Sequence, residues 1–218
     1  MDLRPQPPRR SRELLLGALA FGVLAATARG DAGFVDAVQS ALPGVPPELV
    51  RRLVDEKVVL LASSGDSEPP PVEGLVLFAK PRARVLQLLL QTARQIEYRP
   101  DLARLETVER LPDGDVDVQE MRIMLMHISY WLRYQWDVPA GRISWKLDPR
   151  FPNDLRVTEG FWELHEVDSE HSVARFGTRV DVGPALPSFL QEIATRKNLP
   201  LTLERCRRWV DSDGTYRP

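Results

Sequence analysis

The feature that most constrains this chain is a run of strand-like segments that ends in a single amphipathic helix. Turn-forming sequences such as Pro112-Asp113-Gly114-Asp115 and Pro139-Ala140-Gly141 separate the segments. Connections this short favour antiparallel pairing of neighbouring strands in a meander. The expected strands lie at about 103–110, 115–127, 129–138, 142–148, 155–167 and 171–181. An α+β arrangement of this kind, a bent sheet around one terminal helix, leaves space for an internal cavity.

The residue pattern within these elements supports both the sheet and the last helix. Ile143, Trp145 and Leu147 share one face of a strand, and the residues between them are polar. The apolar stripe of the terminal helix comprises Leu186, Phe189, Leu190, Ile193, Leu199, Leu203, Cys206 and Val210. Because Pro200 falls inside this stripe, we expect the helix to kink or break there.

The domain is predicted to cover residues 72–211, followed by a tail at 212–218. It begins with a strand-like segment, Leu75 to Ala79. Residues 81–96 then have apolar positions at helical spacing, which predicts a helix with one buried face.

Residues 29–71 form an N-terminal extension to that domain. Apolar residues at helical spacing predict helices at about 34–42 and 48–57, and a short strand follows at about 57–62. The Pro69-Pro70-Pro71 run then marks a linker or exposed loop.

Residues 1–28 have the pattern of a secretory signal peptide. An arginine-rich head precedes an uncharged, mostly apolar run at 14–28, and Ala26-Thr27-Ala28 supplies small residues at the cleavage spacing. The apolar run is short for a ~30 Å hydrocarbon core, so a permanent membrane span is disfavoured. The pattern predicts export to the periplasm or out of the cell, with an uncleaved anchor as the alternative.

Charge and cysteine content exclude two further possibilities. The chain carries a net charge of −2, and without residues 1–28, which contribute +2, it carries −4. Nucleic-acid binding needs a basic surface, so DNA and RNA are not expected partners. Cys206 is the only cysteine, so no disulfide can form within the chain. Because it lies on the apolar stripe of the last helix, we expect a buried, unreactive thiol.

Several residues in this order of elements carry a family resemblance. The strand and helix at Leu75–Ile96 have Pro100 downstream, and Gly160-Phe161-Trp162-Glu163-Leu164 matches a Gly-x-Trp-x-Leu strand. After a hairpin, Pro187 opens the terminal helix. Over about residues 72–211, the chain resembles the START-like, polyketide cyclase/dehydrase superfamily (SRPBCC), including its ubiquinone-binding branch.

The resemblance implies a helix-grip fold, in which a curved antiparallel sheet grips the last helix around an apolar cavity. Members bind lipids, quinones or polyketides, and a few catalyse cyclisation or dehydration. Apolar walls with a few polar groups that fix orientation are typical of such a cavity. The residues expected to line it are Met121, Arg122, Met124, Met126, Tyr130, Arg133, Tyr134, Trp145, Trp162, Phe176, Phe189 and Ile193.

Two alternatives stay open for part of this set. The methionines of Met121–Met126 are adaptable and suit a pocket wall, but a strand buried on both faces, covered by residues 29–71, explains them equally well. Arg122, Arg133 and Glu120 either reach the cavity, where an arginine can hold a headgroup oxygen, or point to solvent.

Signatures of catalysis and of metal binding are missing from the sequence. It contains no Gly-x-Ser-x-Gly nucleophile motif and no glycine-rich phosphate-binding loop. His165 and His171 flank an acidic hairpin, but residues on alternate sides of strands do not converge on a metal. We therefore expect no metal and no cofactor.

Three functions remain, in descending order of preference. The first is an exported carrier or sensor of a hydrophobic molecule, such as a lipid, a quinone or a polyketide, with transient membrane-surface contact. The second is an interaction module with a filled core and a protein partner. The third is an aromatase/cyclase-type enzyme in which His127, Glu120 or Tyr130 moves protons.

Overall fold

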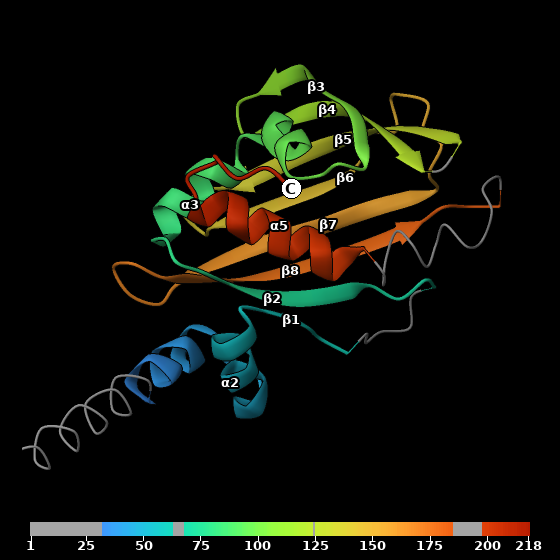
Figure 1. The fold of residues 1–218 in the computed structure, drawn as a ribbon. Coiled ribbons are helices and arrows are strands. Elements are labelled where there is room, and N and C mark those ends of the chain that lie inside the picture. The colour runs from blue at the N-terminus through green and yellow to red at the C-terminus, as the bar shows by residue number, and fades with distance from the viewer. Residues whose placement is uncertain (1–31, 63–67, 124, 185–197) are drawn as a thin grey trace, which may run out of the picture.

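The described residues form one curved antiparallel sheet of eight strands with helices on both of its faces (Figure 1). In this computed structural model they are residues 32–62, 68–123, 125–184 and 198–218. The strands are β1 (Val58–Leu60), β2 (Val72–Phe78), β3 (Leu102–Leu111), β4 (Gly114–Ile123), β5 (Met126–Asp137), β6 (Arg142–Leu147), β7 (Val157–Glu166) and β8 (Ser172–Asp181). Residues 32–41 are helical, and the other helices are α2 (Pro47–Glu56), α3 (Arg82–Leu89), the 3-10 helix η1 (Thr92–Glu97) and α5 (Leu199–Asp211).

The strand order is β1-β2-β8-β7-β6-β5-β4-β3, and each neighbouring pair is antiparallel. The predicted meander is therefore confirmed. One expected strand, 115–127, is wrong at its end. β4 stops at Ile123 and β5 begins at Met126, so a turn divides the methionine-rich segment, and Leu125 within it is 97% exposed.

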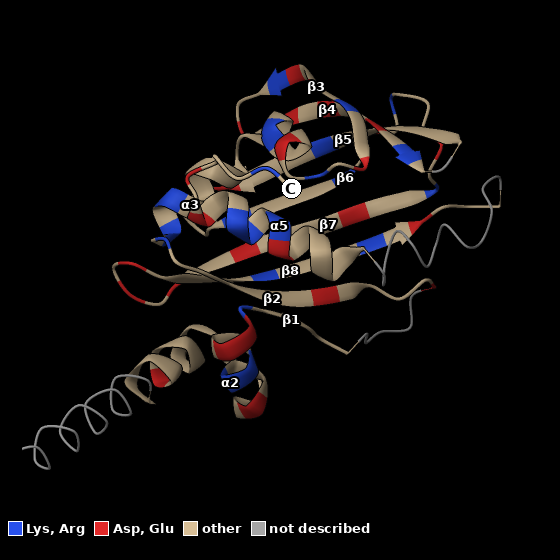
Figure 2. Ribbon diagram, in the orientation of Figure 1, with Lys and Arg blue, Asp and Glu red and all other residues tan. Residues whose placement is uncertain are grey.

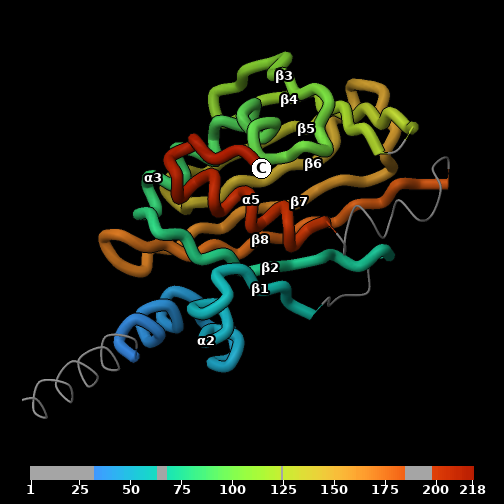
Figure 3. The backbone as a smooth tube through the Cα atoms, viewed as in Figure 1, coloured from blue at the N-terminus to red at the C-terminus, as the bar shows by residue number. Residues whose placement is uncertain are grey.

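The main core lies between the inner face of the sheet and α5 (Figures 1 and 3). The expected stripe of Leu199, Leu203, Cys206 and Val210 is buried in it. Pro200 stands in the first turn of α5, where its missing N–H removes no helical hydrogen bond. The predicted signal peptide, Pro187 and the first half of the stripe, at 186–193, lie outside the described residues.

The predicted helix at 81–96 is two elements. α3 ends at Leu89, and the backbone at Gln91 (φ −83°, ψ 65°) leaves the helical region before η1 begins. η1 is attached to α5, because the Trp209 indole N–H donates to Glu97 Oε2 over 2.8 Å. This change of direction places the residues after η1 at one end of the main core.

The N-terminal extension forms a second, smaller core on the outer face of the sheet. Val50 and Leu53 of α2 pack there with Leu75 and Leu77 of β2 and with Val173. The residues after α2 supply β1, which pairs with β2. The described part of the extension therefore packs on β2 and not on the methionine-rich segment at the β4–β5 turn, where Arg122 and Leu125 are exposed. The alternative of a doubly buried strand covered by residues 29–71 is wrong.

β7 carries acidic residues, whereas charges of both signs lie along β8 and α5 (Figure 2). Several neighbours form ion pairs across strands, such as Arg175 with Glu73 at 2.6 Å and Arg179 with Glu159 at 2.8 Å. Within the described part of the chain, no helix combines the length and the apolar character that crossing a membrane requires.

Candidate ligand-binding cavity

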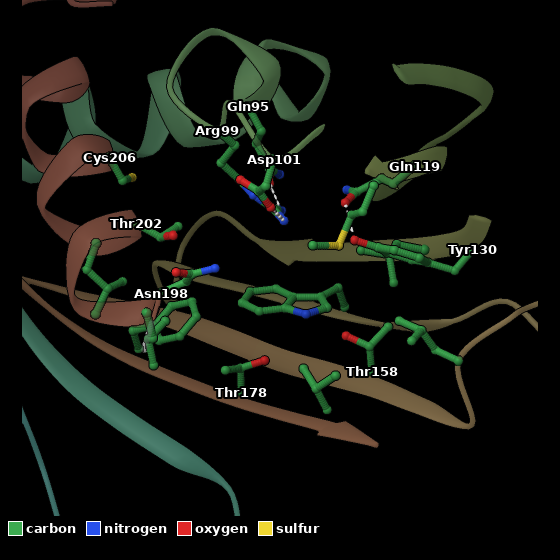
Figure 4. Close-up of a pocket in the computed structure, with 18 of the residues that line it drawn as sticks. Gln95, Arg99, Asp101, Gln119, Tyr130, Thr158, Thr178, Asn198, Thr202 and Cys206 are labelled. Carbon is green, nitrogen blue, oxygen red and sulfur yellow. Dashed lines mark hydrogen bonds and ion pairs between the residues drawn. The ribbon is translucent and has the colours of Figure 1, made fainter. Parts of the chain in front are cut away.

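A cavity of about 170 Å³ lies inside the main core, between the inner face of the sheet, α5 and η1. Figure 4 shows Gln95, Arg99 and Asp101 at one side of it, Thr158 and Thr178 on strands, Asn198 just before α5, and Thr202 and Cys206 on α5. The other lining residues are Leu89, Tyr98, Gln119, Met121, Ile123, Ile128, Tyr130, Leu132, Tyr134, Ile143, Trp145, Leu155, Trp162, Phe176, Val180, Val182, Leu199 and Leu203. The walls are mostly apolar. The charged pair Arg99–Asp101 lies toward η1 together with Gln95, whereas Thr158, Thr178, Asn198 and Thr202 are spread over the rest of the lining.

Three aromatic side chains from neighbouring strands make one wall. The rings of Trp162 and Phe176 meet edge to face with centroids 4.7 Å apart, and Trp145 lies 5.7 Å from Phe176. Contacts of this geometry are favourable between aromatic rings. They give the cavity a broad apolar surface on β6, β7 and β8.

The polar end is a connected group of side chains from η1, β4 and β5. Gln95 Nε2 and Gln119 Nε2 both donate to the Tyr134 hydroxyl, over 3.0 and 3.1 Å. The Tyr130 hydroxyl donates to Gln119 Oε1 over 3.0 Å. Arg99 Nη2 donates to Asp101 Oδ2 over 3.0 Å, and Arg99 Nη1 lies 3.4 Å from Gln95 Oε1.

Electrostatics hold this group in defined protonation states. Burial raises the pKa of Asp101, but the charge and hydrogen bond of Arg99 outweigh that effect, so the pKa lies below its ordinary value. Burial raises the pKa of both Tyr130 and Tyr134. At neutral pH the Arg99–Asp101 pair is therefore ionised and both phenols keep their protons.

Two more acidic side chains, Asp115 and Asp117, lie buried on the same face of β4 as Gln119. Thr107 Oγ1 donates to Asp117 Oδ1 over 2.7 Å. Burial raises the pKa of Asp117, although the hydroxyls of Thr92 and Thr107 partly oppose this. Among the described residues, no three His, Cys, Asp or Glu side chains are arranged to hold a metal ion.

Half of the residues predicted to line the cavity do so: Met121, Tyr130, Tyr134, Trp145, Trp162 and Phe176. Three others do not. Side chains alternate along β4 and β5, so Arg122 and Arg133 lie on the outer face of the sheet with their cross-strand partners. Met126 packs at the edge of the core beside the turn. Met124, Phe189 and Ile193 lie outside the described residues.

Sequence reasoning missed Gln95, Arg99, Asp101 and Gln119. Nothing local in residues 98–101 shows that they turn into the core. A usable signal was present on β4, where Asp115, Asp117 and Gln119 alternate with apolar residues. Residues two positions apart lie on the same face of a strand, so this pattern shows that the three side chains lie together, whichever face of the sheet they occupy.

The proposed acid–base residues are mostly separated from the cavity. Glu120 is on the outer face and forms an ion pair with Arg104 at 2.9 Å. His127 is exposed and is the cross-strand partner of Arg122. Of the three candidates, Tyr130 alone lines the cavity.

A second depression, of about 440 Å³, lies on the outer face of the sheet. Charged side chains form much of its wall, including Arg133, Lys146, Glu159 and Arg179. Arg133 lies 3.4 Å from the buried carboxylate of Asp148. These walls suit an apolar guest less well than the inner cavity does.

No protein-family model matches this sequence, and no curated protein is similar to it. Solved structures are similar in fold. A STAR-related lipid transfer protein from Xanthomonas axonopodis has a TM-score of 0.59 and 15% identity, over 71% of this chain and 94% of that one. Human STARD10 has a TM-score of 0.52 and 12% identity, over 80% of this chain and 91% of that one. The Zhui aromatase/cyclase from Streptomyces sp. R1128 has a TM-score of 0.51 and 16% identity, over 67% of this chain and 98% of that one.

At these identities the likeness shows the fold. The chain has a START-like helix-grip fold, with a curved antiparallel sheet and a C-terminal helix, as the sequence predicted.

Proposed function

We propose that the protein binds a compact hydrophobic molecule in its inner cavity and carries or senses it without changing it. The observation that supports this most is the cavity itself, with aromatic walls and a polar group of side chains at one end. The names of two structural neighbours, a lipid transfer protein and an aromatase/cyclase, are in keeping with a hydrophobic guest.

Cavity size limits what the guest can be. A volume of about 170 Å³ is close to that of an engineered apolar cavity of ~150 Å³ that binds benzene. It is below the ~300–1,000 Å³ of pockets for drug-sized ligands. A single substituted ring, of the kind found in quinones and polyketides, fits this space better than a diacyl lipid does.

The position of the polar residues favours binding over catalysis. Glu120 and His127 lie on the outer face. The one candidate at the cavity is Tyr130, and its hydroxyl donates a hydrogen bond to Gln119. An interaction module would need a filled core, and the cavity argues against that alternative.

Export remains part of the proposal, because the signal peptide pattern lies in residues 1–28. Intact-mass measurement on protein recovered from the host's envelope should show a chain that lacks those residues. Recovery of the whole chain in the cytoplasmic fraction would contradict export.

The binding proposal is tested by native mass spectrometry of the protein purified gently from its own host, followed by organic extraction. We expect a discrete extra mass that becomes a small hydrophobic molecule on extraction. Bare protein, or protein bound only to another polypeptide, would contradict the proposal.

A pair of adjacent substitutions makes this test specific to the cavity. Met121→Trp fills the cavity, whereas Arg122→Trp adds the same side chain to the opposite face of β4. The extra mass should be lost in the first variant and kept in the second, with thermal unfolding measured on both to confirm folding.

A further inference from the structure

The polar end of the cavity holds more hydrogen-bond donors than acceptors. Arg99 has five N–H groups, and within the described ranges Asp101, Gln95 and the Tyr130 hydroxyl accept from them. Its Nε is buried and lacks an acceptor among those residues. A buried charged group that is only partly hydrogen-bonded favours a guest that supplies an acceptor.

The two phenols add another unmatched donor. Tyr134 accepts from Gln95 and Gln119, so both of its lone pairs are used. Gln119 has one carbonyl oxygen, and Tyr130 donates to it. If the amide of Gln119 were reversed, the oxygen would serve Tyr134 and leave Tyr130 without an acceptor. While Gln95 is oriented to accept from Arg99, either orientation of Gln119 leaves one phenolic proton without an acceptor on the described residues.

The charges at this end determine which acceptor is suitable. Arg99 and Asp101 are 3.0 Å apart and sum to zero. Asp115 and Asp117 lie on the same face of β4 as Gln119. A carboxylate guest would add a negative charge where Arg99, the one cation among the lining residues, is already paired with Asp101, whereas a cationic guest would meet Arg99. A neutral oxygen avoids both costs.

We infer that the guest is a compact apolar molecule with a neutral acceptor oxygen, such as a ketone, held by Arg99 and the Tyr130–Tyr134 pair while its ring lies against Trp145 and Phe176. This inference rests on the proposed function and adds the chemical class of the ligand. It excludes free carboxylic acids as guests and predicts that pure hydrocarbons bind less tightly.

Three probes of nearly equal size test this assignment by isothermal titration calorimetry on the full chain. Acetophenone has the neutral oxygen, ethylbenzene replaces its carbonyl by a methylene, and benzoate carries a charge. We expect acetophenone to bind about tenfold more tightly than ethylbenzene, which is the effect of one hydrogen bond to a charged group. Benzoate should bind more weakly than either.

A double variant identifies the residues responsible. Arg99→Met with Asp101→Asn removes both charges together, so neither is left buried and unpaired. Acetophenone should then bind no more than about twofold better than ethylbenzene, and ethylbenzene should bind as it does to the wild type. Arg104→Met with Glu120→Gln removes an ion pair from the outer face and should keep the full preference.

The outcomes separate this inference from the proposed function. Equal binding of acetophenone and ethylbenzene, or tightest binding of benzoate, overturns the ligand class and leaves hydrophobic binding intact. Failure of all three probes to bind also overturns the ligand class and its size limit, and the extraction experiment then decides the proposed function independently.

Discussion

The indole of Trp145 on β6 lies against Gly160, its cross-strand partner on β7. Any Cβ at position 160 would overlap the Trp145 ring and the carbonyl oxygen of Gly177. On the outer face, Phe161 lies over Gly177 in the same way. Two glycines on neighbouring strands therefore let aromatic rings pack closely against opposite faces of one sheet.

Gly160→Ala should destabilise the protein by about 1–3 kcal/mol, because the added methyl group overpacks a filled site and moves the Trp145 ring. Urea unfolding measures the loss, and weaker guest binding should accompany it. Gly33→Ala is the control, since no atom lies within 4 Å of its added Cβ. Equal stability of the two variants would contradict the close packing of Trp145 on Gly160.

Asp117 and Asp148 are both buried but should respond oppositely to pH. Burial raises the pKa of Asp117, so its ionised form destabilises the fold at neutral pH. Asp117→Asn should therefore raise stability at pH 7. The gain should shrink as pH falls through the raised pKa and vanish below the unfolded value of ~3.9.

Asp148 provides the opposite case. Hydrogen bonds from Arg150 lower the pKa of Asp148 to about 2, so its ionised form stabilises the fold. Asp148→Asn should lose stability at neutral pH, and the loss should fade between pH ~4 and about 2. Thermal unfolding from pH 2 to 8 distinguishes the two aspartates, and parallel pH profiles for the two variants would contradict both assignments.

The second core should make the N-terminal extension a necessary part of the fold. Leu53 is fully buried in it, and Leu53→Ala should cost about 2–5 kcal/mol in the free energy of unfolding. Leu125→Ala makes the same chemical change at a side chain that is 97% exposed, and should cost almost nothing. If the two losses in urea are alike, the extension does not stabilise the sheet.

Cys206 should be inert in the folded protein. It is 2% exposed, and burial raises the pKa of its thiol to about 12, so little thiolate forms at neutral pH. A thiol reagent such as 5,5′-dithiobis(2-nitrobenzoate) should react with it only after denaturation. Reaction at the rate of a free thiol in native buffer would disprove its burial.

The general fold could be predicted because its signals are local. Alternation in segments such as Ile143–Leu147 identifies strands, the turn sequences set their order, and the stripe from Leu199 to Val210 identifies the last helix. Each pattern reports which residues share a face. The turn at Leu125 escaped prediction because the residues around it are apolar and contain no glycine or proline.

The polar end of the cavity could not be predicted, because alternation does not say which face of a strand turns inward. Val116 and Val118 are buried on the outer face of β4, beside their cross-strand partners Arg133 and Trp131. The polar row that includes Gln119 faces the cavity instead. Arg99 reaches it only through the change of direction between α3 and η1, which depends on tertiary packing.

β2 is buried on both faces, so the β2 side of the sheet should open less readily than the opposite edge. Amide hydrogens of β2 lie between two cores and should exchange with solvent only on global unfolding. β3, at the opposite edge, has mostly exposed or half-buried side chains and two register shifts. Its amides should exchange by local opening, so a guest would enter or leave most readily where β3, η1 and the polar end of the cavity separate, while β2 stays fixed.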